Sequence, residues 1–208
     1  MHQIRQSASN KLPIPRKGTK YVARASSHLD DSVPVVIAIR DMLKIARTMK
    51  EVEKMIHHKL IKLNGKVVNS VNRSITMFSI LEADHHYELI ISTTGKFVLR
   101  KTDSVKQRLC KVIKKNIVSG GKVQYNLHDG SNFISKDKIN LGDSVYIDFS
   151  GKVVKTIPLE KGKEVFILSG THKGHKGKIL SIDGKKTKIH ITSSKEEVLL
   201  DSSKIIAV

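Results

Sequence analysis

The sequence has few of the residues that build redox sites, metal sites or membrane spans. Among 208 residues there are one cysteine, no tryptophan and only 4% aromatic residues. The single cysteine, Cys110, excludes an internal disulfide and a metal site built from several cysteines. The longest apolar run, residues 33–39, is too short to span a bilayer. The polar, basic start lacks the apolar segment of a signal peptide, so we expect a cytoplasmic protein without a membrane partner.

Acidic residues are missing from one end of the chain. The first 29 residues contain none, and we expect their six Lys and Arg residues to bind RNA: Arg5, Lys11, Arg16, Lys17, Lys20 and Arg24. The excess continues beyond this arm, because the chain has 38 Lys and Arg against 19 Asp and Glu, a formal charge of +19. Such an arm needs an external polyanion, and nucleic-acid phosphate is the commonest one. The alternative is a solvated tail. In either case we expect the arm to be unstructured in the free protein.

Residues 34–68 carry the sharpest local pattern, which predicts two helices and a hairpin. Pro34 can open a first helix, whose apolar residues follow helical spacing to Ala46. Thr48 and Glu51 form a capping box that starts a second helix. Asn64-Gly65 between two apolar runs predicts a hairpin with a type I′ turn.

Basic residues follow the two predicted helices in two stripes. Arg40, Lys44 and Arg47 lie at i, i+4 and i+7, and the same spacing relates Lys50, Lys54 and His57. Lys59, Lys62 and Lys66 extend the charge into the hairpin. A charged stripe on a helix is commonly only a solvated face. Eight positive residues stand here against three acidic ones between residues 40 and 66, so we favour one continuous RNA-facing surface.

The rest of the chain is predicted to be strands and turns. The expected strands cover residues 76–81, 86–92, 96–100, 109–118, 122–127 and 144–149, and glycine turns separate most of them. Cys110 falls in one of these strands, so we expect it to be buried. His57-His58 and His85-His86 are adjacent pairs whose side chains diverge, and His172 and His175 have no third ligand nearby, so we expect no metal site. Nothing indicates a catalytic residue or a cofactor.

A glycine-rich loop precedes the last predicted strands. We expect Lys173, Lys176 and Lys178 to lie near phosphates, and Gly174 and Gly177 to let the loop backbone approach RNA closely. The loop lacks the Gly-Lys-Ser/Thr ending of a nucleotide-binding loop. An ordinary turn with its lysines in water, or a loop that contacts protein, is the alternative.

Together these segments resemble the archaeal and eukaryotic "S-four-E" family of small-subunit ribosomal proteins. Residues 13–21 (PIPRKGTKY) resemble the N-terminal segment of that family, and the helix pair with residues 60–67 (LIKLNGKV) looks like the S-four-type RNA-binding fold. Residues 121–130 (GKVQYNLHDG) look like the family's central domain, and residues 161–182 are similar to a KOW motif. The chain ends at Val208 without the longer basic tail of eukaryotic members, so the resemblance favours an archaeal type.

The resemblance implies an α+β fold in four parts: a basic N-terminal extension (1–33), an S-four-type domain with its helix pair and hairpin (34–100), a central β domain (101–157) and a KOW small β-barrel (158–208). It implies a non-enzymatic, ribosome-bound constituent of the small subunit that binds and stabilises rRNA. Its partners would be this rRNA and neighbouring ribosomal proteins, with no small-molecule substrate. The alternatives are a KOW-type transcription or translation factor, and an rRNA-modifying enzyme that uses the helix pair for targeting.

Overall fold

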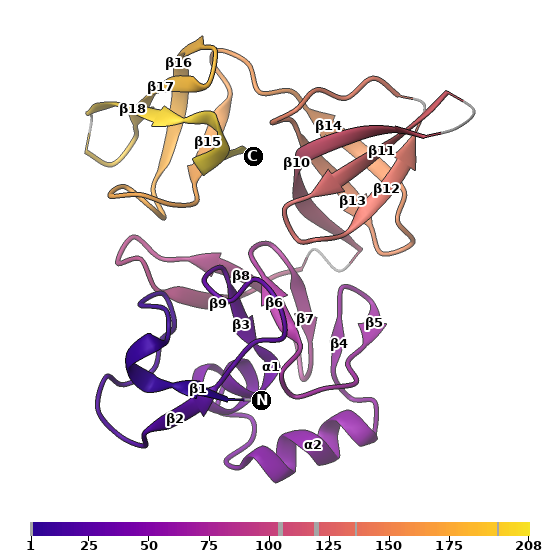
Figure 1. The fold of residues 1–208 in the computed structure, drawn as a ribbon, viewed down its shortest axis with the longest axis vertical. Helices are drawn as coiled ribbons and strands as arrows, with labels where there is room; N and C mark the ends of the chain where they lie inside the picture. The colour runs from indigo at the N-terminus through magenta and orange to yellow at the C-terminus, as the bar shows by residue number, and fades with distance from the viewer. Residues whose placement is uncertain (1, 104–105, 119–120, 136, 195) are drawn as a thin grey trace. The chain divides into compact units, whose positions relative to one another are not determined.

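The computed structural model describes residues 2–103, 106–118, 121–135, 137–194 and 196–208. The chain divides into two compact units, Met1–Lys106 and Gln107–Val208. Strands are the main regular structure of the described chain, and apart from two short 3-10 turns its helices lie between residues 35 and 57 (Figure 1). Within these ranges, no helix has the length and apolar character that a membrane span needs.

The first unit is built on a five-stranded antiparallel sheet with the order β5-β4-β7-β8-β9. Its strands are β4 (Lys62–Leu63), β5 (Lys66–Val67), β7 (Ile80–Glu82), β8 (His86–Ile91) and β9 (Phe97–Lys101). Two smaller sheets pair β1 (His2–Ile4) with β2 (Tyr21–Ala23), and β3 (Ser32–Pro34) with β6 (Ser74–Thr76). The alternating burial of β8 shows why its sequence predicts a strand, since every second side chain faces the core.

The first helical segment is shorter than its sequence predicts. Helix α1 (Val35–Ile37) runs directly into the π-helical turn η2 (Ala38–Met42), in which the Leu43 amide donates to the Ala38 carbonyl at 2.9 Å. The helix ends at Lys44, whose φ is 57°. The expected regular helix through Arg47 is therefore wrong. Residues 35–39 are buried on every side, so their apolar spacing carries no information about where the helix ends.

The second helix agrees with its prediction. Helix α2 spans Met49–His57, and the Thr48 hydroxyl accepts a hydrogen bond from the Glu51 amide at 3.3 Å. The Glu51 carboxylate accepts one from the Arg47 amide at 2.8 Å. At the other end, Lys59 adopts a φ of 57° and the Leu60 amide donates to the Met55 carbonyl, which closes the helix. The capping box is thus confirmed.

The hairpin at Asn64-Gly65 is also confirmed. Both residues have positive φ, 51° and 76°, as a type I′ turn requires, and Leu63 pairs with Lys66. The Asn64 side chain also accepts a hydrogen bond from the Ile80 amide at 2.8 Å. The single strand expected over residues 76–81 is wrong, because β6 ends at Thr76 and Phe78 has a φ of 60° before β7 begins.

The N-terminal arm is folded onto the first unit. Strand β1 pairs with β2, and Leu12 is only 2% exposed. The Phe97 amide donates to the Lys11 carbonyl, and the Lys96 ammonium donates to the Asn10 carbonyl, both across more than 80 residues of sequence. The expectation of an unstructured arm is therefore wrong. A few apolar residues and backbone pairing with distant segments order it, and neither signal is local in the sequence.

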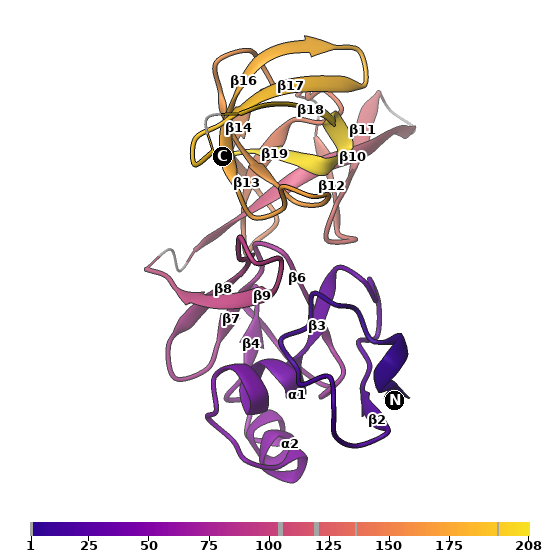
Figure 2. The same ribbon diagram turned by 90° about the vertical axis from the view of Figure 1, so that its left-hand side faces the viewer.

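The second unit contains two five-stranded antiparallel sheets (Figure 2). The central sheet has the order β12-β11-β10-β13-β14, with β10 (Gln107–Val118), β11 (Lys122–Leu127), β12 (Asn132–Ser135), β13 (Ser144–Asp148) and β14 (Val153–Ile157). Its core holds Tyr125, Val145 and Cys110, whose burial is as expected. Strands β12 and β14 were not predicted from the sequence.

The C-terminal sheet has the order β18-β17-β16-β15-β19 and an aliphatic core of its own. Its strands are β15 (Glu164–Ile167), β16 (Lys176–Asp183), β17 (Lys186–Ile191), β18 (Glu197–Asp201) and β19 (Ile205–Ala207), and the 3-10 turn η3 (Ser202–Lys204) joins the last two. Separate small cores agree with a composition that is low in aromatic residues.

Candidate RNA-binding surface

A groove of about 1220 Å³ lies in the first unit, between the N-terminal arm and the helical segment. The arm contributes Lys17 and Tyr21, and the segment after α1 contributes Arg40, Lys44 and Arg47. We call this feature the basic groove. The fold thus brings part of the predicted arm and the whole first predicted stripe to one place, although they are separated in the sequence.

The residues of the first stripe share the groove for a different reason from the one predicted. Arg40 lies in η2, Lys44 has left that turn with positive φ, and Arg47 lies before the cap of α2. Their common i, i+4, i+7 phase therefore does not exist in the structure. The π-helical turn and the left-handed Lys44 instead redirect the chain so that all three line the groove.

Arg40 carries a counter-charge inside the groove. Its guanidinium donates two hydrogen bonds to the Asp41 carboxylate, both at 2.8 Å. The hydrogen bonds to Asp41 raise the pKa of Arg40, and both side chains remain about one-third exposed. The bidentate pair fixes the plane of the guanidinium and offsets much of its charge. Lys44 and Arg47 are exposed, and neither side chain forms an ion pair within 4 Å of an acidic group among the described residues. The hydrogen bonds that its carboxylate accepts, and to a smaller extent the charge of Arg47, lower the pKa of the neighbouring Glu51.

Arg5 lines the basic groove, but its guanidinium is occupied by the arm itself. Its nitrogens donate to the carbonyls of Thr19 and Pro15 at 2.7 and 2.6 Å, and to the Thr19 hydroxyl at 2.9 Å. Gly18, with a φ of 136°, lies so close that a Cβ there would be 3.0 Å from an Arg5 nitrogen. Arg5 therefore holds the loop of residues 15–19, which the sequence could not show.

The other basic residues of the arm divide into two groups. The Lys11 ammonium forms an ion pair with Asp31, which offsets its charge. Arg16, Lys17, Lys20 and Arg24 are exposed, and the Lys20 ammonium lies 5.4 Å from the centre of the Tyr21 ring. The exposed group keeps its charge available to an external anion.

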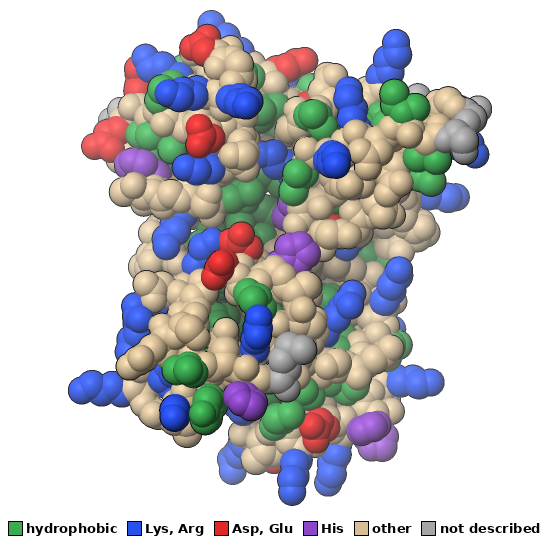
Figure 3. All heavy atoms as spheres, viewed as in Figure 1, with side chains coloured by type: hydrophobic (Ala, Val, Ile, Leu, Met, Phe, Trp, Pro, Cys, Tyr) green, Lys and Arg blue, Asp and Glu red, His purple; other side chains and the backbone are tan. Residues whose placement is uncertain are grey.

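The predicted stripe on α2 exists as an exposed face. Lys50, Lys54 and His57 are exposed, while Val52 and Ile56 on the opposite side are buried. Lys and Arg side chains project along this part of the surface (Figure 3). Lys59 and Lys66 are exposed next to it in the chain, and the Lys62 ammonium lies 3.8 Å from the Glu82 carboxylate.

In the C-terminal glycine-rich loop, the lysines lie at or near the surface, but one of the two glycines does not. Lys176 and Lys178 are exposed, Lys173 is half-buried, and Gly174 has a φ of 84°. Gly177, in contrast, is buried in β16, where a Cβ would lie 2.6 Å from the His190 carbonyl oxygen. The expectation that Gly177 allows RNA to approach is therefore corrected: this glycine allows β16 and β17 to pack together.

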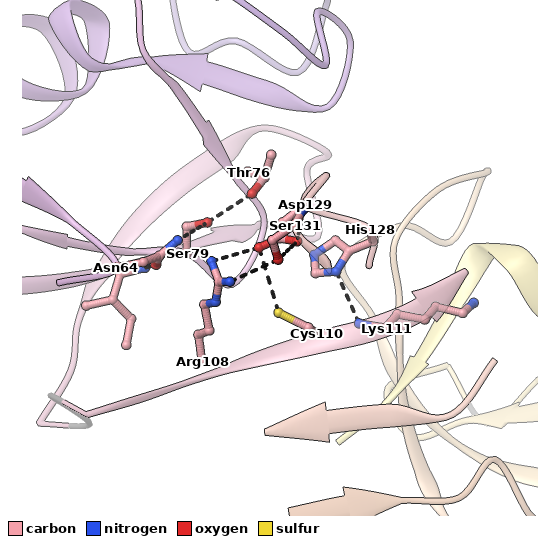
Figure 4. Close-up of polar contacts among 10 residues, drawn as sticks. Asn64, Thr76, Ser79, Arg108, Cys110, Lys111, His128, Asp129 and Ser131 are labelled. Atoms are coloured by element: carbon pink, nitrogen blue, oxygen red, sulfur yellow. Dashed lines mark hydrogen bonds and ion pairs between the residues drawn. The ribbon is translucent and has the colours of Figure 1, made fainter. Parts of the chain in front are cut away.

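Two cations of the second unit have internal roles that sequence analysis missed. The Arg108 guanidinium pairs with Asp129 at 2.7 Å and donates to the Ser131 hydroxyl at 3.0 Å (Figure 4). Burial raises the pKa of Asp129, but the guanidinium and Ser131 outweigh this and hold the pKa below its ordinary value. The Lys111 ammonium donates to the carbonyls of Ser202, Ser203 and Ile205 at 2.5–3.0 Å.

Two family models match the chain. The model of the ribosomal family S4e matches residues 83–154, and the model of the KOW motif matches residues 161–192. Both matches fall outside the basic groove: the first covers β8 and β9 of the first unit and the central sheet as far as β14, and the second covers β15 to β17 of the C-terminal sheet.

Similar proteins extend the match across most of the chain. The small ribosomal subunit protein eS4 of Methanocella arvoryzae is 31% identical over 188 residues, which are 87% of this chain and 80% of that protein. The protein of the same name from Halobacterium salinarum is 34% identical over 191 residues, 88% of this chain and 82% of that one. The crystal structure of the 30S ribosomal protein S4e from Thermoplasma acidophilum has a TM-score of 0.73 and 26% identity, and covers 86% of this chain and 95% of that one.

Proposed function

The chain belongs to the ribosomal S4e (S-four-E) family, and we propose that it is a structural constituent of the small ribosomal subunit that binds and stabilises rRNA. The basic groove is the observation that supports this proposal best. Lys17, Lys44 and Arg47 bring unneutralised charge from two separate segments to one open surface. Closely spaced phosphates are the anions that such a surface fits, because each contact releases condensed counterions.

The exposed basic residues around the groove would extend the contact. We assign Arg16, Lys20 and Arg24 of the arm to this surface, together with the α2 stripe of Lys50, Lys54 and His57 and the neighbouring Lys59, Lys62 and Lys66. In the second unit, Lys173, Gly174, Lys176 and Lys178 would form a separate contact. Arg5, Lys11 and Arg40 have internal partners, so they would position the surface more than they neutralise phosphate.

The same proposal includes the finer architecture and the cellular context. We divide the chain into the extension 1–33, the S-four-type domain 34–100, the central domain 101–157 and a KOW barrel 158–208. Its partners would be small-subunit rRNA and neighbouring ribosomal proteins in the cytoplasm. The role is non-enzymatic, with neither cofactor nor small-molecule substrate, because neither matching model describes an enzyme.

A double substitution in the groove tests this function. Lys44→Ala with Arg47→Ala should weaken binding to protein-free small-subunit rRNA and reduce the log–log salt slope by roughly one for each lost phosphate contact. The fold should persist, because the Arg47 backbone amide that supports Glu51 remains. Binding is measured over a salt series, and thermal melting checks the fold.

Lys152→Ala with Lys155→Ala is the matched control, since both lysines are exposed in the second unit. An unchanged salt slope in the groove variant contradicts the assignment of the groove. Co-sedimentation separates the function from that of a factor: a ribosomal constituent stays with the small subunit in moderate salt, and a factor washes off.

A further inference from the structure

The far end of β10 separates from β13 and continues beside β11, whose other edge pairs with β12 from Val123 to Asn126. Strand β10 pairs with β13 only from Gln107 to Lys111, whereas its pairing with β11 runs from Val112 to Val118. A register shift between Val112 and Lys114 marks the point of departure. In Figures 1 and 2 the ends of β10 and β11 extend together past the rest of the central sheet. We call residues 113–118 and 122–124 the ribbon.

The ribbon exposes apolar and basic side chains together. Ile117 is 87% exposed and Ile113 is 58% exposed, which is far more than packing in their own sheet would leave. Lys114, Lys115 and Lys122 are exposed, and none of them pairs with an acidic group among the described residues. The sequence from residue 107 to residue 128 contains no Asp or Glu at all. The surface thus attracts an anion and also offers apolar area to cover.

The strand geometry places charge on both faces of the ribbon. Successive side chains of a strand point to opposite faces, so Lys114 and Lys115 diverge. Lys122 is paired with Val118 and shares the face of Lys114, whereas Ile117 shares the face of Lys115. A ribbon charged on both faces fits between two phosphate backbones. A flat protein surface would contact only one of these faces.

We propose that the ribbon is a second RNA-binding element, which lies in a groove or bend of rRNA with its lysines near phosphates and Ile117 against a ribose or base. This inference rests on the proposed function and adds a site outside the basic groove and the glycine-rich loop. The wide minor groove of an RNA helix presents phosphates and 2′-hydroxyls to such an element. Apolar side chains are used elsewhere as wedges between bases. The absence of acid favours RNA over protein as the occupant.

A tethered cleavage reagent tests the position directly. Ile117→Cys introduces one accessible thiol, because the native Cys110 is 1% exposed and burial raises its pKa to about 12. An iron chelate attached at residue 117 should cut protein-free small-subunit rRNA in a short cluster of nucleotides. Val154→Cys, at a 61% exposed position on the edge strand β14 of the same sheet, should give no such cluster.

Charge removal tests the same element independently. Lys114→Ala with Lys115→Ala should reduce the salt slope of rRNA binding by roughly one to two, while Lys152→Ala with Lys155→Ala should leave it unchanged. Failure of the parent chain to bind rRNA would refute the proposed function itself. Suppose instead that the parent chain binds rRNA and the groove variant behaves as expected. An unchanged salt slope for Lys114→Ala with Lys115→Ala, together with no cleavage cluster from residue 117, would then overturn only the proposal for the ribbon. Cross-linking of residue 117 only to protein in whole subunits also overturns it.

Discussion

Two pairs of cationic side chains, one pair in each unit of this protein, have opposite tasks. In the first unit, Lys44 and Arg47 are exposed around the basic groove, and their charge is available to an external anion. In the second unit, Arg108 and Lys111 point into the fold and bind a carboxylate and backbone carbonyls. All four contribute equally to the net charge of +19. Burial, and not charge, decides whether a cation serves binding or folding.

The physical difference lies in the solvent around each group. An exposed cation keeps its water, costs little, and loses influence as salt screens it. A buried cation must be fully satisfied by partners, and the loss of one partner leaves an uncompensated charge. Substitutions at the exposed Lys44 and Arg47 should therefore change salt-dependent binding, and substitutions at the buried Arg108 and Lys111 should change stability.

The largest effect is expected from Arg108→Ala. This change leaves the Asp129 carboxylate, whose side chain is 5% exposed, without its ion pair. We expect the free energy of unfolding to fall by about 3–5 kcal/mol. Urea unfolding of the full chain, followed by a probe in the central sheet, measures the change.

The control is Arg100→Ala on β9. Its guanidinium also pairs with a carboxylate at 2.8 Å, that of Glu88, but the Arg100 side chain is 60% exposed. We expect a loss below about 1 kcal/mol there. Similar losses at both positions would mean that burial does not distinguish these pairs, and the comparison between the two units would fail.

The sequence predicted elements whose signals are local. Helix α2 has a capping residue and one buried face, and the hairpin needs only Asn64-Gly65 between apolar residues. The end of the first helix at Lys44 could not be predicted, because burial on all sides removes any periodic signal from residues 35–39. The folded arm was missed for a related reason: the carbonyls of Lys11 and Leu12 accept hydrogen bonds from the Phe97 amide and the Lys96 ammonium, which lie far away in the sequence.

The site was predicted in composition more than in geometry. Lys44 and Arg47 were selected by a helical phase that the structure does not contain, although the fold brings them together in the basic groove. Lys11 and Arg5 look like free charges in the sequence, but their partners lie 10 to 20 residues away. Only the folded chain shows which cations are already paired.

Lys111→Met is expected to have an intermediate effect. The ammonium is buried, and it donates to three carbonyls near the C-terminus, those of Ser202, Ser203 and Ile205. Its removal takes this donor from the buried Ile205 carbonyl and from the less buried carbonyls of Ser202 and Ser203, but it also removes a buried charge, so we expect a loss of about 1–3 kcal/mol at pH 7. Thermal melting and urea unfolding of the full chain measure it.

The difference in the free energy of unfolding between the parent chain and Lys111→Met should also depend on pH, which gives a sharper test. Burial lowers the pKa of Lys111 from 10.5 to about 8. Between pH 8 and 10.5 the folded chain has released this proton while the unfolded chain still binds it, so the stability of the parent should rise with pH relative to the variant. A shift of this size corresponds to an increase in the free energy of unfolding of roughly 3–4 kcal/mol over this pH range.

In the unfolded chain Cys110 also titrates in this pH range, and its effect on stability has the opposite sign. Burial raises the pKa of its thiol from 9 to about 12, so the folded chain holds this proton longer and its stability falls as pH rises above 9. This contribution is present in both parent and Lys111→Met, and it cancels in their difference. If the stability difference between the parent chain and Lys111→Met does not change from pH 8 to 10.5, the pKa of Lys111 is not lowered in the folded chain.

The smallest effect, and the one that sharpens the comparison most, is expected at Arg5. This residue belongs to the arm of the first unit, yet its guanidinium is engaged by Pro15 and Thr19. Arg5→Ala should lower stability by about 1 kcal/mol and weaken rRNA binding two- to fivefold, because the loop carrying Lys17 loses its support. The log–log salt slope of rRNA binding should change by less than the value expected for the loss of one phosphate contact. Gly18→Val should give the same pattern, since its Cβ would meet the guanidinium and its φ of 136° disfavours a side chain. If Arg5→Ala instead removes a full unit of slope and leaves stability unchanged, Arg5 binds phosphate directly.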